Sequence, residues 1–455
     1  MIYQAYQLQM DLLEPAHMLS SALSACLSKI AVGRSPHSVT THLAAASEVF
    51  GRLRLTHERP DYRIRTIRVG NQELDVEEKA VAATPFGTLL RFRRESDEEL
   101  PRVLLVAPMS GHFATLLRET VRVLLNDHEV YATDWHNARD IPLAAGAFGL
   151  DDYVDHLIDW MALLGPNAHM IAVCQPCAAA LAAAAIMAAD GHPAEPASLT
   201  LMAGPVDASI NPTRVNQLAT SKPIEWFERS LIGIVPARYR GALRQVYPGF
   251  VQLTAFMSMN IERHRNAFRD LYDKLVAGDH DRAAATAQFY EEYFAVADLP
   301  AEFYLETVSR VFQNFELARR CFHHRGRPVD TSALRRMALL TIEGERDDIC
   351  AVGQTVAAHD LCDRLRPYRR AHHVQTGVGH YGVFSGRRWE RLPTVAEPLA
   401  SQLRAEVDHF SIFGVFALQP SRLPETGADL TAGFSPLIVV ALGVVALSLL
   451  RRVLL

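Results

Sequence analysis

The stretch "HMIAVCQPCAAALAAAAIMAA", residues 169 to 189, places a cysteine between a short apolar run and an alanine-rich run. The apolar run predicts a strand buried on both faces and the alanine-rich run predicts a helix, so Cys174 should stand on the turn between them. A side chain on such a turn is pushed out above the sheet, and the N-terminus of the following helix favours a thiolate and a developing oxyanion. Small Ala172 leaves room for a sharp turn, and Pro176 suits a first helical position. The stretch therefore predicts a nucleophile at Cys174.

Short apolar strands alternate with helices along much of the chain. Strands are expected at RVLLVAP (102–108), EVYATDW (129–135), HMIAV (169–173), SLTLMAG (198–204), MALLTIEG (337–344) and AHHVQT (371–376). Helices are expected near 113–126, 150–164, 176–190, 354–365 and 388–406. This alternation predicts an α/β fold with a mostly parallel, doubly wound sheet.

The alternation stops over residues 205–330, where long helical patterns with many aromatic residues take over. Because the strands resume afterwards, we expect a helical lid inserted into a catalytic core. The expected ranges are an N-terminal helical segment (1–65), the first part of the core (66–204), the lid (205–330), the second part of the core (331–410), a linker (411–433) and a hydrophobic tail (434–455).

A thiol nucleophile needs a general base, and the base needs an acid that orients it. Asp347 follows one later strand and His380 follows the next, in the order nucleophile, acid, histidine that α/β-hydrolases use. Both lie at the carboxyl end of a strand, where open α/β sheets place their sites. Asp348 and Asp207 compete for the role of the acid, and the G-x-x-D-x-I spacing favours Asp347.

Two backbone N–H groups are expected to hold the oxyanion. One belongs to Gln175, which follows the nucleophile, and the other to the loop APMSGH after the first core strand. Within that loop Met109 and Ser110 are both candidates, and the sequence does not choose between them.

Several stretches together resemble a known family, the intracellular polyhydroxyalkanoate (polyhydroxybutyrate) depolymerases. They are VLLVAPMSGHFATLLRETV, ATDWHNARDIPL, FGLDDYVDHL, AVCQP, LTLMAGPVDASINPTRVN, TIEGERDDI and GVGHYGVFSGRRW, and the resemblance covers most of residues 1 to about 408. It implies an α/β-hydrolase fold that breaks the ester bonds of storage polyester on intracellular granules. It also implies Cys174 as nucleophile, Asp347 as orienting acid and His380 as general base.

The residues around the nucleophile depart from two patterns. Polyester synthases, the neighbouring family, place their cysteine in G-x-C-x-G, whereas this chain has Ala172 and Pro176 at the flanking positions, which favours a depolymerase. Cys177 is unusual for the resembled family. One helical turn after Cys174, it is expected to pack beside the site, and a disulfide between the two cysteines would make the enzyme redox-sensitive.

Charge, cysteine content and motif spacing argue against nucleic-acid binding, a disulfide-rich fold and a metal or cofactor site. The chain carries 46 basic and 51 acidic side chains for a net charge of −5, which argues against a nucleic-acid partner. Six cysteines in 455 residues are too sparse for a disulfide framework, so a reducing compartment is expected. The pairs His323–His324 and His372–His373 lack the spacing of a zinc site, and no strand is followed by a phosphate-binding glycine motif. We expect no metal and no bound cofactor, with coenzyme A a candidate acyl acceptor.

The two ends of the chain carry different signals. We expect no secretion signal in the first residues, because polar side chains interrupt the apolar stretches there. Near the other end an uncharged run from Leu430 to Leu450 has about the length of a bilayer core, and Arg451 and Arg452 close it. LPETG (423–427) precedes this run and resembles a sortase signal. We expect a cytoplasmic, granule-associated enzyme; membrane contact through 434–450 and cell-wall sorting are the alternatives.

The sequence thus predicts a polyhydroxyalkanoate depolymerase with the triad Cys174, Asp347 and His380. The thiolate would attack a polymer ester, and water or coenzyme A would release the product. Two alternatives stay open: an acyltransferase like the polyester synthases, and a non-catalytic protein bound to granules or to the envelope. The sequence does not indicate an oligomeric state.

Overall fold

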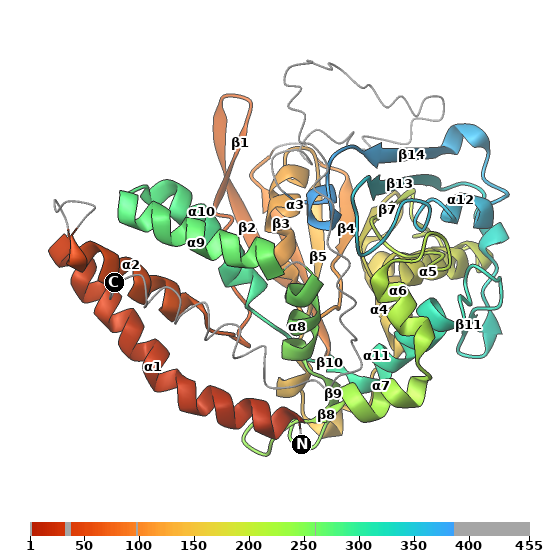
Figure 1. The fold of residues 1–455 in the computed structure, drawn as a ribbon. Coiled ribbons are helices and arrows are strands. Elements are labelled where there is room, and N and C mark those ends of the chain that lie inside the picture. Colours follow the sequence, from red (N-terminus) through yellow and green to blue (C-terminus); the bar gives the residue numbers. More distant parts are fainter. Residues whose placement is uncertain (1, 32–37, 97–98, 260, 386–455) are drawn as a thin grey trace. The chain divides into compact units, whose positions relative to one another are not determined.

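In the computed structural model, nine strands of the described residues form one sheet (Figure 1). Its order is β1-β2-β3-β5-β4-β6-β7-β13-β14. The bounds are β1 (Thr66–Val69), β2 (Gln72–Ala83), β3 (Gly87–Arg94), β4 (Arg102–Val106), β5 (Glu129–Trp135), β6 (His169–Val173), β7 (Ser198–Met202), β13 (Ala338–Gly344) and β14 (Arg370–Gln375). From β5 to β14 all neighbours pair in parallel, and β1 to β3 add an antiparallel edge. This is the strand order of an α/β-hydrolase, so the predicted fold class is confirmed.

The structure describes residues 2–31, 38–96, 99–259 and 261–385. These residues divide into two units. Residues 2–12, 55–256 and 288–385 make up the first unit, which holds the sheet, and residues 13–54 and 257–287 make up the second. The expected lid range, 205–330, therefore contributes to both units.

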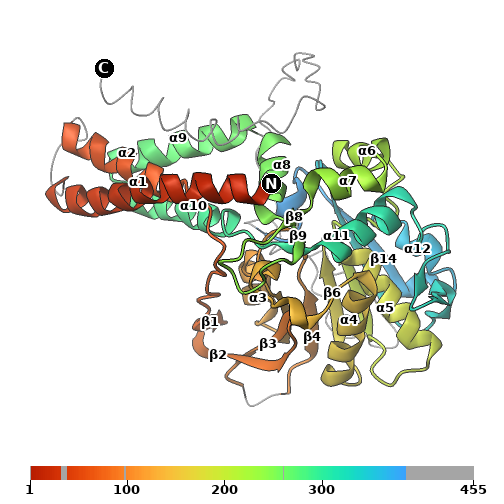
Figure 2. The ribbon, with the colours of Figure 1, turned by 90° about the horizontal axis from the view of Figure 1, so that it is seen from below.

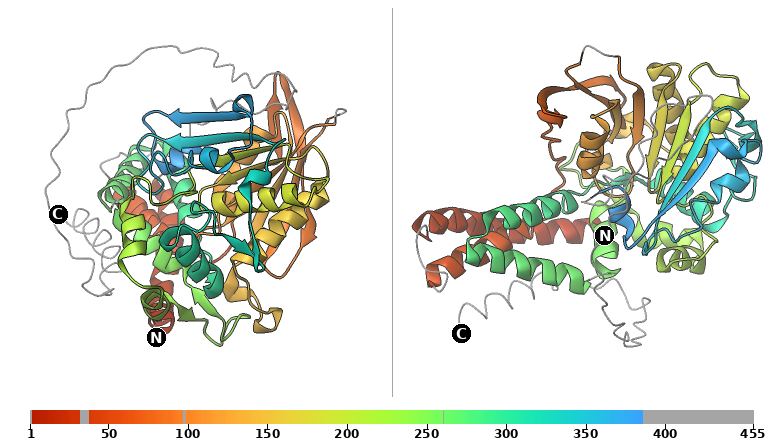
Figure 3. Two further views of the ribbon diagram at one scale, coloured as in Figure 1. Left: turned by 90° about the vertical axis from the view of Figure 1, so that its right-hand side faces the viewer. Right: turned by 90° about the horizontal axis from the view of Figure 1, so that it is seen from above.

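Successive side chains of β4 pack on opposite faces of the sheet, and helices cover both faces. Leu104 and Val106 belong to one hydrophobic cluster, with helices α4 (Leu150–Leu164) and α5 (Cys177–Ala189). Val103 and Leu105 belong to a second cluster, with helix α3 (Arg118–Leu124). Because neighbouring residues of a strand point to opposite faces, α3 lies on one face and α4 and α5 lie side by side on the other (Figure 2). Figure 3 shows the sheet running from its antiparallel strands in orange to β14 in blue.

The segment between β7 and β13 is helical, as predicted, but it also contains short strands that the sequence did not indicate. Its helices in the first unit are α6 (Arg214–Ser221), α7 (Ile224–Leu231), most of α8 (Gly249–Met259) and α11 (Ala301–Thr307), which continues as a π-helical turn, Val308–Gln313. The short strands are β8 (Gly233–Ile234), β9 (Gln245–Tyr247), β10 (Leu299–Pro300), β11 (His323–His324) and β12 (Arg327–Pro328). Pro236 and Pro248 explain the interruption, because proline has no N–H to donate within a helix.

The second unit is built from helices. They are α1 (Ile2–Ala31) from residue 13 onward, α2 (Val39–Arg52), α9 (Ile261–Ala277) and α10 (His280–Tyr293) up to residue 287. His42 Nδ1 lies 2.8 Å from the Tyr272 hydroxyl and joins α2 to α9. The Ser20 hydroxyl donates to the carbonyl oxygen of Ser47 and joins α1 to α2.

Of the two helices expected in the second part of the core, one is shorter than predicted and the other lies outside the described residues. The helix expected near 354–365 is only one turn, α12 (Ala358–Leu361). The N–H groups of Gly353, Thr355 and Val356 donate to the Glu343 side chain, which fixes the preceding residues in a loop. The helix expected near 388–406, the linker with LPETG and the hydrophobic tail lie outside the described residues. Within the described ranges, no helix has both the length and the apolar character needed to cross a bilayer.

Candidate active site

Cys174 stands on a strained turn between β6 and α5. Its backbone has φ 66°, in the left-handed region that non-glycine residues rarely adopt. Two bonds fix this turn: the Cys174 N–H donates to the carbonyl oxygen of Met202 on β7 (2.8 Å), and the Cys177 N–H donates to the carbonyl oxygen of Cys174 (3.2 Å). The predicted strand–turn–helix geometry of a nucleophile elbow is therefore present.

Gly204, just past the end of β7, makes room for this turn. A Cβ at position 204 would overlap the carbonyl oxygen of Cys174 and the sulfur of Cys177. Only glycine lets the end of β7 come this close to the elbow. The elbow thus depends on a residue that is thirty positions away in the sequence.

The structure brings the three predicted residues together in one hydrogen-bonded chain. His380 Nε2 lies 3.1 Å from the sulfur of Cys174, and His380 Nδ1 lies 2.8 Å from Asp347 Oδ2. Asp347 and His380 are buried, with 8% and 5% of their surfaces exposed, whereas Cys174 is half-buried. The thiol can therefore be reached from outside while the acid and the imidazole are shielded from water.

The loop after β13 holds the carboxylate of Asp347 in place. Its Oδ1 accepts the N–H groups of Ile349 (2.9 Å) and Cys350 (2.8 Å), which leaves Oδ2 for the imidazole. The Arg346 N–H donates to the carbonyl oxygen of Val378 and ties this loop to the one that carries His380. The acid and the base are thus oriented by backbone bonds.

A second buried carboxylate lies beneath the same loop. Glu343 on β13 is fully buried, and its Oε1 accepts the N–H groups of Gly353 (3.0 Å), Thr355 (2.7 Å) and Val356 (3.1 Å). The Thr355 hydroxyl in turn donates to the carbonyl oxygen of Gly204 (2.9 Å). Glu343 therefore connects the loop after β13 to the glycine that packs under the elbow.

Electrostatics favour a charged imidazole at this site. Burial alone would lower the pKa of His380, but the negative charges of Asp347 and of the Cys174 thiolate, together with the hydrogen bonds to both, raise that pKa well above its ordinary value. A protonated His380 is the partner that a cysteine thiolate needs. The arrangement is suited to nucleophilic attack by sulfur.

The predicted oxyanion residues also meet. Met109 lies in the loop after β4, and its N–H donates to the side-chain oxygen of Gln175 (3.3 Å). Ser110, the other candidate in this loop, is half-buried. The structure thus places the Met109 N–H beside the residue that follows the nucleophile.

Residues 203–402 match the family model described as "PHB de-polymerase C-terminus". These residues make up less than half of the chain, and over them it is similar to the C-terminal part of the PHB depolymerase family. Asp347 and His380 lie inside the matched range and Cys174 precedes it. The match agrees with the α/β-hydrolase fold that the sheet order shows, and it supports an ester hydrolase.

Among curated proteins, no sequence matches this chain. Among solved structures, a putative lipase from Acinetobacter baumannii AYE is 15% identical, covering 69% of this chain and 87% of its own (TM-score 0.37). A 2-hydroxy-6-oxo-6-phenylhexa-2,4-dienoate hydrolase from Rhodococcus sp. strain RHA1 is 12% identical, covering 70% and 95% (TM-score 0.38). A Bacillus megaterium epoxide hydrolase is 14% identical, covering 70% and 94% (TM-score 0.37). Identities this low say nothing about the substrate of this chain.

Other residues that the sequence singled out have different surroundings. Asp207 Oδ1 accepts the N–H and the hydroxyl of Ser209, so it is oriented within its own loop. Cys177 is fully buried, and its thiol contacts the carbonyl oxygens of Ala172 (3.4 Å) and Met202 (3.8 Å). Burial raises the pKa of Cys177 well above its usual range, and all six cysteines are free thiols in this structure. Cys177 therefore packs beneath the elbow.

One histidine of each pair has a partner outside the triad. His324 Nε2 is 2.8 Å from Asp155, and His372 Nδ1 is 2.9 Å from the Thr341 hydroxyl. Among the residues that the structure describes, no cluster of three or more histidine, cysteine or acidic side chains is arranged to hold a metal ion.

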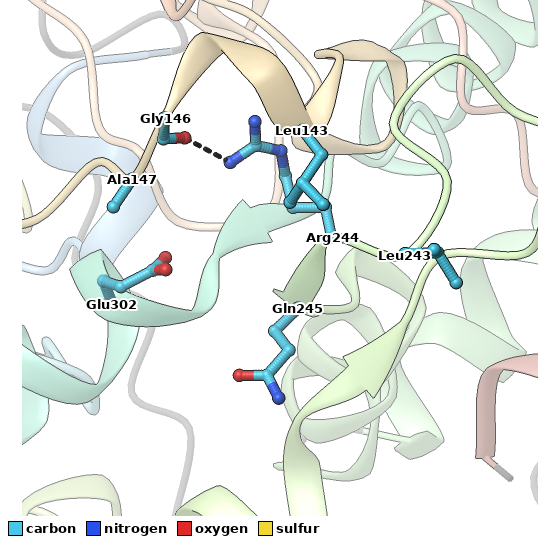
Figure 4. Close-up of a pocket in the computed structure, with 7 residues that line it drawn as sticks. All are labelled: Leu143, Gly146, Ala147, Leu243, Arg244, Gln245 and Glu302. Atoms are coloured by element: carbon cyan, nitrogen blue, oxygen red, sulfur yellow. Dashed lines mark hydrogen bonds between the residues drawn. The ribbon is translucent and has the colours of Figure 1, made fainter.

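Figure 4 shows a pocket whose lining includes none of the triad residues. It is lined by Leu143, Gly146, Ala147, Leu243, Arg244, Gln245 and Glu302. The guanidinium of Arg244 donates to the carbonyl oxygens of Ile141, Pro142 and Gly146, so it fixes the loop after β5. The pocket contains none of the predicted site residues.

Three contributions to the site were missed by the sequence reasoning: Gly204, Glu343 and the side chain of Gln175. Two of them leave a trace in the sequence. Gly204 closely follows an apolar strand, and Glu343 is the one charged residue in the buried strand Ala338–Gly344, a place where a charge is costly unless it is hydrogen-bonded. The role of the Gln175 side chain depends on a loop 66 residues earlier, so no local sequence pattern could predict it.

Proposed function

We propose that this chain is a polyhydroxyalkanoate depolymerase that cleaves ester bonds of storage polyester through a cysteine nucleophile. The observation that carries the proposal is the hydrogen-bonded chain from Cys174 through His380 to Asp347, on an elbow with left-handed backbone. The match to the PHB depolymerase model supports a polyester as the substrate.

The proposed reaction has two halves. His380 takes the proton of Cys174, and the thiolate attacks the carbonyl carbon of a polymer ester, forming a C–S bond and a tetrahedral oxyanion. As the oxyanion collapses, the ester C–O bond breaks and the imidazolium gives its proton to the alkoxide that leaves. An acyl-thioester then stays on Cys174, with His380 neutral again.

In the second half an acceptor releases the acyl group. His380 removes a proton from water, hydroxide attacks the thioester carbonyl, and the thiolate leaves and regains its proton. Coenzyme A as the acceptor would give a 3-hydroxyacyl thioester instead, and a growing polymer chain as the acceptor would make the protein a synthase. The product formed from polymer therefore distinguishes the three reactions.

An aromatic cluster beside the base suits an uncharged, apolar ester. The ring of Tyr381 lies 5.8 Å from that of His380, 6.2 Å from Tyr293 and 6.4 Å from Phe289. Phe289 is 39% exposed, so part of this cluster faces solvent. Polyester segments carry methyl groups and no charge, and such rings can pack against them.

The test compares Cys174→Ala with Cys321→Ala, which removes an exposed cysteine elsewhere in the first unit. Both proteins are given amorphous poly(3-hydroxybutyrate) granules, with and without coenzyme A, and soluble products are identified by mass spectrometry. We expect release of 3-hydroxybutyrate or its oligomers by Cys321→Ala and none by Cys174→Ala, with equal far-UV circular dichroism. Polymer hydrolysis by folded Cys174→Ala would exclude the mechanism, and unhydrolysed granules with both proteins would favour a binding protein.

The location is proposed together with the activity. A depolymerase of storage polyester acts on granules in the cytoplasm, so we place this chain on the granule surface. Fractionation of the full chain and of a chain truncated at residue 420 tests this, because the truncated chain lacks LPETG and the apolar run. Recovery of the full chain in the membrane or cell-wall fraction, and of the truncated chain with granules, would assign the tail as an anchor.

A further inference from the structure

The side chain of Gln175 accepts a hydrogen bond from the Met109 N–H, one of the two backbone donors expected to bind the oxyanion. The Met109 N–H donates to Gln175 Oε1 over 3.3 Å. Met109 is only 5% exposed, and a buried N–H group without an acceptor costs free energy. The acceptor that Gln175 supplies is therefore energetically significant. An amide oxygen and an ester carbonyl oxygen are both sp² acceptors, and a single N–H cannot bond fully to both.

The loop that carries Met109 does not depend on Gln175 for its position. The Ala107 N–H donates to the Thr133 hydroxyl (2.9 Å), and the Ala107 carbonyl oxygen accepts the indole N–H of Trp135 (3.0 Å). At the other end of the loop, the carbonyl oxygen of Gly111 accepts the Ala297 N–H (3.0 Å). The bond from Met109 to Gln175 is therefore an addition to a loop that is already fixed at both ends.

We propose that the Gln175 side chain is a built-in competitor of the substrate: its amide oxygen fills the oxyanion position, and an ester carbonyl must displace it. This inference rests on the proposed function, because it assigns Met109 as the second oxyanion donor. Gln175 then sets how strongly an ester binds, in addition to donating its own backbone N–H.

The expected size of the effect follows from the strength of one hydrogen bond. When the binding-competent state is only partly populated, the apparent affinity falls by that fraction. A net hydrogen bond in a protein corresponds to roughly a 2- to 10-fold change in such a population. Removing the competitor should therefore lower KM for a short ester by about 2- to 10-fold, while kcat changes by less than about twofold.

The experiment uses full-length Gln175→Met, which keeps the side-chain length but has no amide, and Gln175→Ala, which guards against the methionine filling the site itself. Gln72→Met, at an exposed position on β2, is the matched control. The substrate is p-nitrophenyl 3-hydroxybutyrate. The second readout is inhibition by butyraldehyde. The Cys174 thiol adds to the aldehyde carbonyl and forms a thiohemiacetal, whose oxygen would lie at the oxyanion position.

The proposal predicts that both Gln175 variants lower KM and the inhibition constant of butyraldehyde by similar factors, whereas Gln72→Met changes neither. A fall in kcat with weaker aldehyde inhibition would mean that the Gln175 amide assists the oxyanion or holds the loop, and would overturn the proposal. Unchanged constants would overturn it as well, because the N–H would then be open in solution. Failure of the proposed function looks different: the unmodified enzyme would release no nitrophenol, or Cys174→Ala would release it equally well.

Discussion

Glu343 offers a sharp test of the structure because its carboxylate organises the loop next to the catalytic acid. It is fully buried, and three backbone N–H groups, of Gly353, Thr355 and Val356, converge on its Oε1. Its other oxygen, Oε2, accepts the Gly353 N–H as well (3.0 Å) and lies 3.6 Å from His372 Nε2. The perturbation is Glu343→Gln, which keeps the shape and removes the charge.

The magnitude follows from these three donors. Hydrogen bonds to a charged group contribute about 1.5–3 kcal/mol each and those to a neutral group about 1 kcal/mol, so each N–H loses roughly 1 kcal/mol on the change. With three donors the free energy of unfolding should fall by about 3 kcal/mol. The new amide N–H₂ would also face the Gly353 N–H, donor against donor, which adds to the loss.

The assay is urea unfolding at pH 7, with Glu345→Gln as the matched control. Glu345 is exposed and accepts one N–H, that of Gly377 (2.6 Å), so its change should alter the free energy of unfolding by no more than about 0.5 kcal/mol. The loop also leads to Gly204 through Thr355, so kcat on a short ester should fall in Glu343→Gln. A Glu343→Gln protein within 1 kcal/mol of the unmodified chain would refute the reasoning.

Three further predictions concern the elbow and the base. Gly204→Ala should destabilise the fold by about 1–3 kcal/mol and lower kcat at least roughly 100-fold, since its Cβ overlaps the Cys174 carbonyl oxygen; activity near normal on a short ester would contradict this. In the chain that keeps Cys174, the pKa of His380 is raised by Asp347 and Cys174 against the effect of burial, so His380 should stabilise the fold fully below about pH 6.5 and progressively less as the pH rises through that raised pKa. Urea unfolding from pH 5 to 9 should therefore show a falling difference between the unmodified chain and His380→Gln, and a constant difference would be the wrong outcome. Cys177 should resist a thiol reagent that labels Cys174 in the native protein, as peptide mapping would reveal, and oxidant should create no disulfide between them.

Local patterns were sufficient for the fold class and for much of the site geometry. The apolar runs around Cys174, before Asp347 and before His380 are short and bounded, and each became a parallel strand that ends at the site. Because parallel strands end on the same edge of a sheet, three residues far apart in sequence converge there. Helix α4 (Leu150–Leu164) also has the bounds that the sequence predicted, since its apolar positions recur at helical spacing.

Where the sequence reasoning fell short, tertiary contacts decide the local structure. The helix expected from residue 354 begins only at Ala358, and Glu343, on another element, accepts the N–H groups of three residues in the loop before it. The glycine at 204 is required by a backbone oxygen of Cys174, and its position after an apolar strand does not reveal that long-range contact. The engagement of Met109 with Gln175 arises in the same way, from two loops that meet only in the folded chain.

The central claim is that Cys174 carries the acyl group during turnover, and the direct measurement is to trap that group. Enzyme is mixed with p-nitrophenyl 3-hydroxybutyrate, quenched in acid within milliseconds and digested, and the peptide that contains Cys174 is weighed by mass spectrometry. The account predicts a 3-hydroxybutyryl adduct on Cys174 that neutral hydroxylamine removes, as it does for thioesters, and that is absent from Cys174→Ala. Turnover with an unmodified Cys174, or with the acyl group on another residue, would contradict the account.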